Sequence, residues 1–275
     1  MVKPSLVLFL CLLFCLLNSP ADAAPTPTSV TAARAPAPST ATASTPPLLQ
    51  GVHRIVTMGA SITQFGSSPG GYVWLLGHYL NALYPQAHIQ IINAGVSGNT
   101  SADMLARFQK DVLEQHPDLV TIKLGYNDLT LRFQDHPQGD GPQGASAEDY
   151  GKNAEAMVKL AQAAHIRILL MTPTIYEDSP KSIRNQKLQA YVRVMQDLAA
   201  NYHLPLADQN AALLQAWLSQ PSDQPQRLTT DGVHLTPTGN QVLARTTLLA
   251  MGIEPRQLAA VEPTVQQQLT AATSK

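Results

Sequence analysis

The sequence predicts an α/β fold, a doubly wound three-layer α/β/α domain around a sheet of about five parallel strands. Two observations predict this class. Short apolar runs alternate along the chain with segments of helical periodicity. The runs are apolar at nearly every position, which is typical of parallel strands covered on both faces.

Each expected element follows from its own pattern. Apolar runs of strand length cover residues 52–58, 89–93, 119–124, 166–171 and 204–207. Segments of helical periodicity lie between them at residues 72–83, 101–115, 148–164 and 181–202, and a last helix starts near Pro237. Ser146 and Asp149 form a capping box before the third helix, and Pro180 suits the first turn of the fourth.

The N-terminus has the pattern of an export signal. Residues 1–23 combine Lys3, an apolar stretch at 6–17 and a small-residue Ala-Asp-Ala site at 21–23. The apolar stretch is too short for a membrane-spanning helix, which needs about 20 residues. We therefore expect a signal that is cleaved, no stable membrane insertion afterwards, and a secreted, periplasmic or cell-envelope location.

The rest of the chain divides by composition. Residues 24–47 are almost entirely Ala, Pro, Ser and Thr, which cannot bury enough apolar area to fold, so we expect a disordered linker. The folded domain is expected at 48–253, followed by a polar, Gln-rich tail at 254–275. Cys11 and Cys15 both lie inside the signal, which excludes thiol chemistry from the mature chain.

Charge and motifs exclude several functions. The chain has 18 Lys and Arg against 19 Asp and Glu, a net charge of −1, without the cationic excess that nucleic-acid binding needs. It has no His-Glu-x-x-His zinc motif and no phosphate-binding Gly-x-x-x-x-Gly-Lys loop. We expect no metal, no cofactor and no nucleic acid, and we expect the protein to be a monomer.

Polar clusters follow the expected strands, at the edge where parallel sheets place their sites. They are Gly-Ala-Ser-Ile-Thr at 59–63, a Gly- and Asn-rich stretch at 93–100, Leu-Gly-Tyr-Asn-Asp at 124–128, and Asp-Gly-Val-His-Leu-Thr-Pro at 231–237. Together they supply a hydroxyl, glycines, an amide, and a carboxylate close to an imidazole. That is the set of groups needed for acyl transfer.

These four clusters, in this order over residues 56–239, resemble the SGNH (GDSL) hydrolase superfamily of serine esterases and lipases. The resemblance implies a flavodoxin-like three-layer fold and an ester-bond hydrolase, whose partner is a small-molecule or polysaccharide ester substrate. It also implies a nucleophile at Ser61, an oxyanion hole of Ser61, Gly98 and Asn127, an orienting acid at Asp231 and a base at His234.

One position departs from the family. Where the family has Asp immediately before the serine, this chain has Ala60. That Asp is not the orienting acid of the triad, so catalysis is not excluded, but a support of the nucleophile loop is missing.

The chemistry agrees with these roles. A serine hydroxyl needs a base to take its proton during attack, and histidine does this near neutral pH. Asp231, three residues before His234, is close enough to hold the other ring nitrogen. Backbone N–H groups and the Asn127 amide are donors for the oxyanion, and at Gly98 a side chain would obstruct the carbonyl.

Other interpretations stay open. Ser61 and Asp231 also suit helix caps or turns, the glycines and Asn127 suit turns, and His234 suits a structural histidine. The serine lacks the second glycine of a Gly-x-Ser-x-Gly elbow, against an ordinary α/β-hydrolase.

Two segments are expected to shape the substrate pocket. They are residues 64–74 and a Gly-, Pro- and Gln-rich insertion at 130–147, which we expect to form a lid. Short acyl or O-acetyl esters, on carbohydrate among others, are favoured. Lysophospholipids, thioesters and a catalytically inactive glycan- or envelope-binding descendant are the alternatives.

Overall fold

The computed structural model describes residues 45–179, 181–221, 223 and 225–274. The expected signal and nearly all of the expected linker lie outside them. The described chain has a parallel sheet in the order β2-β1-β3-β4-β5. Its strands are β1 (Arg54–Gly59), β2 (Gln90–Gly95), β3 (Leu119–Lys123), β4 (Arg167–Met171) and β5 (Leu206–Ala207).

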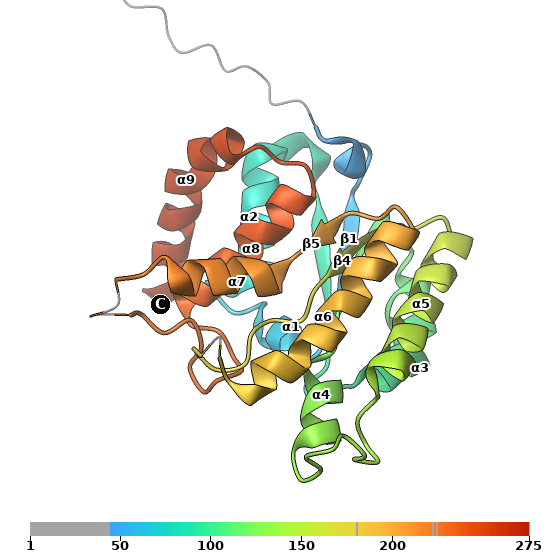
Figure 1. Cartoon of the computed structure of the whole chain (residues 1–275). Helices are drawn as coiled ribbons and strands as arrows, with labels where there is room; N and C mark the ends of the chain where they lie inside the picture. The colour runs from blue at the N-terminus through green and yellow to red at the C-terminus, as the bar shows by residue number, and fades with distance from the viewer. Residues whose placement is uncertain (1–44, 180, 222, 224, 275) are drawn as a thin grey trace, which may run out of the picture. The chain divides into compact units, whose positions relative to one another are not determined.

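Helices cover both faces of the sheet, which confirms the predicted three-layer α/β fold (Figure 1). One face carries α1 (Ser61–Phe65), α2 (Tyr72–Leu83), α7 (Gln209–Leu218), α8 (Pro237–Ala250) and α9 (Pro255–Thr273). The other carries α3 (Ser101–Asp111), α4 (Tyr126–Phe133), α5 (Ala147–Ala163) and α6 (Ile183–Asn201). Single 3₁₀ turns lie at Pro47–Leu49, Pro85–Ala87 and Leu113–Gln115.

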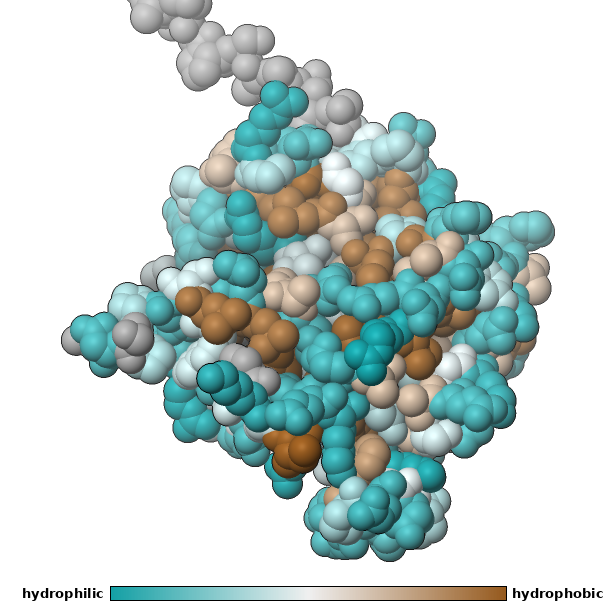
Figure 2. All heavy atoms as spheres, viewed as in Figure 1, coloured by the Kyte–Doolittle hydropathy of each residue, from teal (hydrophilic) through white to brown (hydrophobic). Residues whose placement is uncertain are grey.

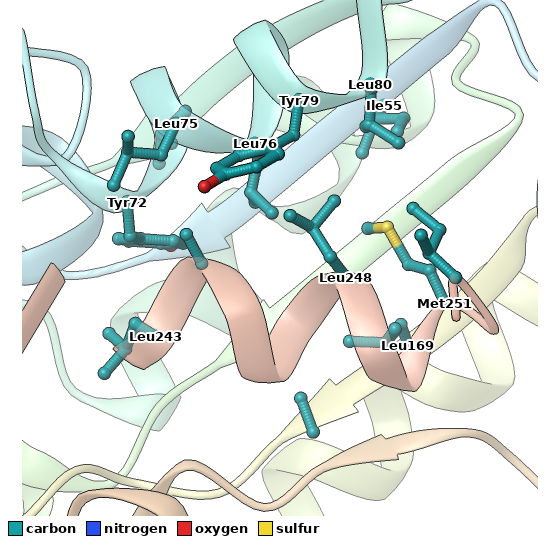
Figure 3. Close-up of a cluster of buried hydrophobic side chains, with 14 of the residues drawn as sticks. Ile55, Tyr72, Leu75, Leu76, Tyr79, Leu80, Leu169, Leu243, Leu248 and Met251 are labelled. Carbon is teal, nitrogen blue, oxygen red and sulfur yellow. The ribbon is translucent and has the colours of Figure 1, made fainter. Parts of the chain in front are cut away.

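The strand alternation divides the core in two. Ile55 of β1 packs with α2 and α8, whereas Val56 and Met58 face α3, α5 and α6. Figure 3 shows the first cluster, where Leu76 of α2 and Leu248 of α8 meet, both fully buried. In the view of Figure 2, hydrophilic side chains cover most of the surface, with smaller hydrophobic patches between them.

The five strands lie where the apolar runs predict them, and α2 begins and ends at the predicted residues. The short helices α1, α4 and α7 were not predicted. The C-terminal residues also differ from the expectation of a tail, because α9 packs along α2 with Leu258 and Val265 buried. No helix in the described ranges combines the length and the apolar character needed to cross a membrane.

The topology sets the place of the site. From β1 the chain passes to β2 on one side, and then to β3 on the other side of β1. The strand order therefore reverses at β1, and ligands of such sheets bind beyond the carboxyl ends of the strands at this point. The segments that begin with Ser61 and Tyr126 both leave the sheet there, at the lower end of the view in Figure 1.

Candidate active site

Ser61 is the first residue of α1, directly after β1. Two glycines let this short helix lie against the strand ends. A Cβ added to Gly59 would overlap the side chain of Thr63, and one added to Gly95 would overlap the backbone of Gln64. Ser61 is therefore held at the carboxyl edge of the sheet, half-buried.

Hydrogen bonds to β2 and to the loop that follows it hold α1 in place. Asn93 donates from Nδ2 to the Thr63 carbonyl over 2.6 Å, and its Oδ1 accepts the Gly95 N–H over 2.8 Å. The Gln64 side chain accepts the N–H of Ser97 over 2.7 Å. These contacts join the nucleophile segment to the loop that carries Gly98.

Gly98 has a φ of +81°, a backbone conformation that side chains disfavour. A Cβ added there meets nothing within 4 Å. The protein's own atoms would therefore leave room for a side chain at position 98. The left-handed backbone conformation, and not close packing, accounts for the glycine. Among the described residues, the backbone N–H groups of Gly98 and Ser61 have no hydrogen-bond acceptor.

Asn127 lies in the first turn of α4, after β3. Its Nδ2 donates to the Asn99 carbonyl over 2.8 Å, which fixes the amide and leaves its second hydrogen available. Asn127, Asn99 and Ser61 line one narrow pocket, together with Val233 from the loop that precedes α8.

Asp231 and His234 form a close pair in that loop. His234 Nδ1 lies 2.6 Å from Asp231 Oδ2, and Asp231 Oδ1 accepts the N–H of Val233 over 2.9 Å and that of His234 over 2.8 Å. Partial burial alone would raise the pKa of the Asp231 carboxyl. The hydrogen bonds from His234 and Val233 outweigh it and lower this pKa to about 2. The carboxylate is therefore ionised at neutral pH.

The His234 ring lies beside the nucleophile helix. It meets the Phe65 ring edge-on, with centroids 5.4 Å apart, and Phe65 is one helical turn beyond Ser61 on the same face of α1. Ile62 lines both the Ser61 pocket and a second pocket that contains His234. His234 Nε2 is buried without a hydrogen-bond partner among the described residues. The structure thus brings Ser61, Asn127, Asp231 and His234 to one edge of the sheet, with Gly98 next to the pocket-lining Asn99.

Three further residues of this edge were not singled out from the sequence. Asp128 is fully buried and accepts the N–H of Ser101 over 3.0 Å and its hydroxyl over 2.6 Å, which ties α4 to the start of α3. Lys123, the last residue of β3, lines the Ser61 pocket at 5% exposure, and burial lowers the pKa of its ammonium to about 7. Arg107 of α3 contacts the ends of β1 and β2. Asp128 could have been found from the sequence, because it lies next to Asn127 in one of the polar clusters. The positions of Lys123 and Arg107 become apparent only in the fold.

Only one of the two segments expected to shape the substrate pocket lies beside the site. Of the first segment, Phe65, Gly66 and residues 68–71 line the pocket beside His234. The insertion expected to be a lid lines neither this pocket nor the Ser61 pocket. Its residues are tied to α6 instead, since Lys187 donates to the Pro137 carbonyl and Tyr191 to the Ala145 carbonyl, each over 2.6 Å. Figure 2 shows the tip below α4 as hydrophilic.

Comparison with known proteins identifies the chain as an ester-bond hydrolase. The sequence model of the GDSL-like lipase/acylhydrolase family matches residues 57–242, and the chain belongs to this family, within the SGNH hydrolase superfamily. No cluster of His, Cys, Asp or Glu suited to a metal ion occurs in the part of the chain that the structure covers.

The relatives that match the chain include several esterases. The chain is 30% identical over 190 residues to an acetylxylan esterase of Geobacillus stearothermophilus, covering 69% of this chain and 84% of the relative. It is 30% identical over 208 residues to a human isoamyl acetate-hydrolyzing esterase 1 homolog, covering 69% and 77%. The crystal structure of Axe2, an acetylxylan esterase from G. stearothermophilus, superposes with a TM-score of 0.65 at 28% identity, covering 74% of this chain and 95% of that one.

Proposed function

We propose that the protein is an exported serine esterase that hydrolyses O-acetyl or other short acyl esters of a bulky alcohol, such as a carbohydrate, through a Ser61-His234-Asp231 triad. The observation that carries this proposal is the orientation of His234. Its Nδ1 is held by Asp231, and its Nε2 is buried beside the helix that begins with Ser61, with no hydrogen-bond partner in the described ranges of the chain.

The proposed reaction has two halves. Ser61 Oγ attacks the ester carbonyl while His234 Nε2 takes the hydroxyl proton, and Asp231 stabilises the imidazolium. The tetrahedral oxyanion accepts hydrogen bonds from the N–H groups of Ser61 and Gly98 and from the Asn127 amide. The C–O bond breaks, the alcohol leaves with the proton from Nε2, and water then hydrolyses the acyl-enzyme by the same steps.

The two pockets differ in size, which supports a short acyl group. The Ser61 pocket, on the Asn127 side, has a free volume of about 10 Å³, enough for roughly one water molecule or a methyl group. The open pocket on the His234 side has about 420 Å³. Because His234 protonates the leaving alcohol, the alcohol belongs on its side. A small acyl group on a large alcohol fits this asymmetry, whereas the long chain of a lysophospholipid does not.

The lining of the larger pocket supports a neutral, hydroxyl-rich alcohol. It contains the Phe65 ring, which is 55% exposed, together with Ser68 and Asn240, and none of the Asp, Glu, Lys and Arg residues that the structure describes lines it. Aromatic faces and neutral hydrogen-bonding groups suit a sugar better than a phosphate or a carboxylate.

The relatives support both the substrate class and the residues. The matched proteins include an acetylxylan esterase and an isoamyl acetate esterase homolog, whose esters carry the acetyl group. Axe2 variants described as catalytic mutants replace a serine, an aspartate or a histidine by alanine, and that aspartate and histidine are three positions apart, as are Asp231 and His234. Export is supported by the signal pattern at residues 1–23.

A panel of esters tests the proposal. The purified mature protein should hydrolyse p-nitrophenyl acetate and acetylated oligosaccharides, and kcat/KM should fall at least tenfold from the acetyl to the octanoyl ester. Comparable or faster turnover of octanoyl esters, lysophospholipids or acyl thioesters would replace the short-acyl assignment. Absence of all turnover would favour the catalytically inactive descendant.

A further inference from the structure

Arg107 makes an unusual set of contacts at the edge of the sheet. Its side chain projects from α3 and is only 16% exposed. Nη2 donates to the Gly59 carbonyl and Nη1 to the Ala94 carbonyl, both over 2.9 Å, and Nε donates to Asn99 Oδ1 over 2.6 Å. Nη1 also pairs with Asp111 over 2.7 Å, on the same helix.

The first three acceptors belong to the two segments that carry Ser61 and Gly98, and one of these acceptor residues, Asn99, contacts the third proposed oxyanion-hole donor, Asn127. Gly59 ends β1, two residues before Ser61, and Ala94 lies in β2, four residues before Gly98. Asn99 accepts the Asn127 amide at its backbone carbonyl. One guanidinium therefore connects the nucleophile turn, the Gly98 loop and the Asn127 side chain.

We propose that Arg107 is a positioning residue that holds the three oxyanion-hole donors in their mutual geometry. This inference rests on the proposed function, because it concerns the donors of the same site. Arg107 touches none of the reacting atoms and acts through Gly59, Ala94 and Asn99.

The physical basis is the shape and charge of the guanidinium. It is planar, permanently charged, and directs its donors in a fixed fork, so acceptors bound to it are fixed relative to one another. Hydrogen bonds from a charged donor are about twice as strong as neutral ones. The Gly59 carbonyl also accepts the Val96 N–H over 3.1 Å, so the same oxygen joins both turns. Ala60 lacks the carboxylate that the family has at this turn. Arg107 supports the same turn through its hydrogen bond to the carbonyl of Gly59, the residue before Ala60.

A set of variants separates positioning from simple stabilisation. Arg107→Ala removes all four contacts, and Arg107→Lys keeps the charge but cannot form the fork. Asp111→Asn is the matched control, because it weakens only the contact that lies within α3. Asn99→Ala removes the acceptor of Nε while leaving the backbone carbonyl that holds Asn127.

The readouts are kcat and KM for p-nitrophenyl acetate, the rate of phosphonate labelling of Ser61, and the melting temperature. A misplacement of about 1 Å costs roughly 10² in rate. Arg107→Ala should therefore lose about 10²-fold in kcat and in labelling rate, with KM changed less than about threefold. Arg107→Lys and Asn99→Ala should each lose at least about tenfold. Asp111→Asn should keep wild-type kcat even where its melting temperature falls.

Two outcomes would contradict the positioning role of Arg107 without contradicting the proposed esterase function. One is a folded Arg107→Ala or Arg107→Lys protein with the kcat of Asp111→Asn. The other, which decides the matter if both Arg107 variants fail to fold, is an Asn99→Ala protein with wild-type kcat. Failure of the proposed function gives a different result, an inactive wild type or an active Ser61→Ala variant.

Discussion

The Asp231 carboxylate holds His234 from two directions: Oδ2 lies 2.6 Å from the ring Nδ1, and Oδ1 accepts the backbone N–H of the same residue over 2.8 Å. One side chain thus fixes both the ring and the loop that carries it. Because Nδ1 is engaged, only Nε2 is left to exchange a proton, and this atom is buried beside α1 without a partner in the described chain.

Asp231→Asn tests this relationship. The amide cannot compensate the charge of the imidazolium and favours the wrong tautomer, so kcat should fall by on the order of 10⁴ with little change in KM. The measurement is steady-state kinetics on p-nitrophenyl acetate. A loss below about threefold would mean that another group orients His234.

The same carboxyl has a consequence for stability in acid. Its pKa is lowered from 3.8 to about 2 in the folded state, so the stabilisation is complete above about pH 4 and is lost as pH falls towards 2. The difference in unfolding free energy between wild type and Asp231→Asn should shrink over that interval. A difference that is constant from pH 5 to pH 2 would contradict the assigned hydrogen bonds.

Phe65→Ala tests the proposal that the alcohol of the ester binds on the His234 side of the site. Losing one aromatic contact of about 0.5–1.5 kcal/mol should lower kcat/KM for an acetylated oligosaccharide by roughly 3–10-fold. Hydrolysis of p-nitrophenyl acetate should change less. Leu218→Ala is the control, since it removes another exposed hydrophobic side chain that lines neither site pocket. Equal losses on both substrates would argue that Phe65 only supports His234.

Ala60→Asp tests whether the nucleophile turn has adapted to alanine. Ala60 packs against an apolar cluster that includes Met58 and Met104, so the new carboxylate is costly to bury. We expect the melting temperature to fall by more than about 4 °C, as for a loss above about 1–2 kcal/mol, without a gain in kcat. Ala60→Asn, similar in size and neutral, should lose less. Higher turnover with an unchanged melting temperature would contradict this expectation.

Lys123→Met tests the buried lysine. Its ammonium has a pKa of about 7 in the folded protein and 10.5 in the unfolded chain. Between these values the unfolded state binds more protons, so the cost of burying Lys123 is greatest below pH 7 and declines as pH rises. The variant's advantage in unfolding free energy should therefore be largest near pH 6 and smaller at pH 9, measured by urea denaturation. An advantage that does not vary with pH would contradict the depressed pKa.

Much of the fold and site could be predicted because the relevant signals are local. The five strands are short apolar runs, and the polar residues after them meet because parallel strands end at one edge. The triad candidates lie in those clusters, so the proximity of Ser61 and His234 could be predicted from the sequence.

The parts that escaped prediction depend on long-range packing or on segments too short for a pattern. Helix α1 has five residues, fewer than two turns, so no periodicity can reveal it. Helix α9 buries mainly Leu258 and Val265 against α2, which leaves a polar composition that resembles a tail. Arg107 binds backbone carbonyls of distant strands, and nothing around it in the chain indicates this. The insertion after α4 was long enough for a lid, but its contacts with Lys187 and Tyr191 become visible only in the fold.

The central claim, that Ser61 is the nucleophile of an acyl-enzyme, is tested most directly by covalent labelling. The purified mature protein is incubated with an activated phosphonate ester and analysed by intact mass and peptide mapping. The account predicts one adduct per chain, located on Ser61, and neither an adduct nor turnover in a Ser61→Ala protein with unchanged melting temperature. An adduct on another serine, or a Ser61→Ala protein that still hydrolyses acetyl esters, would contradict it.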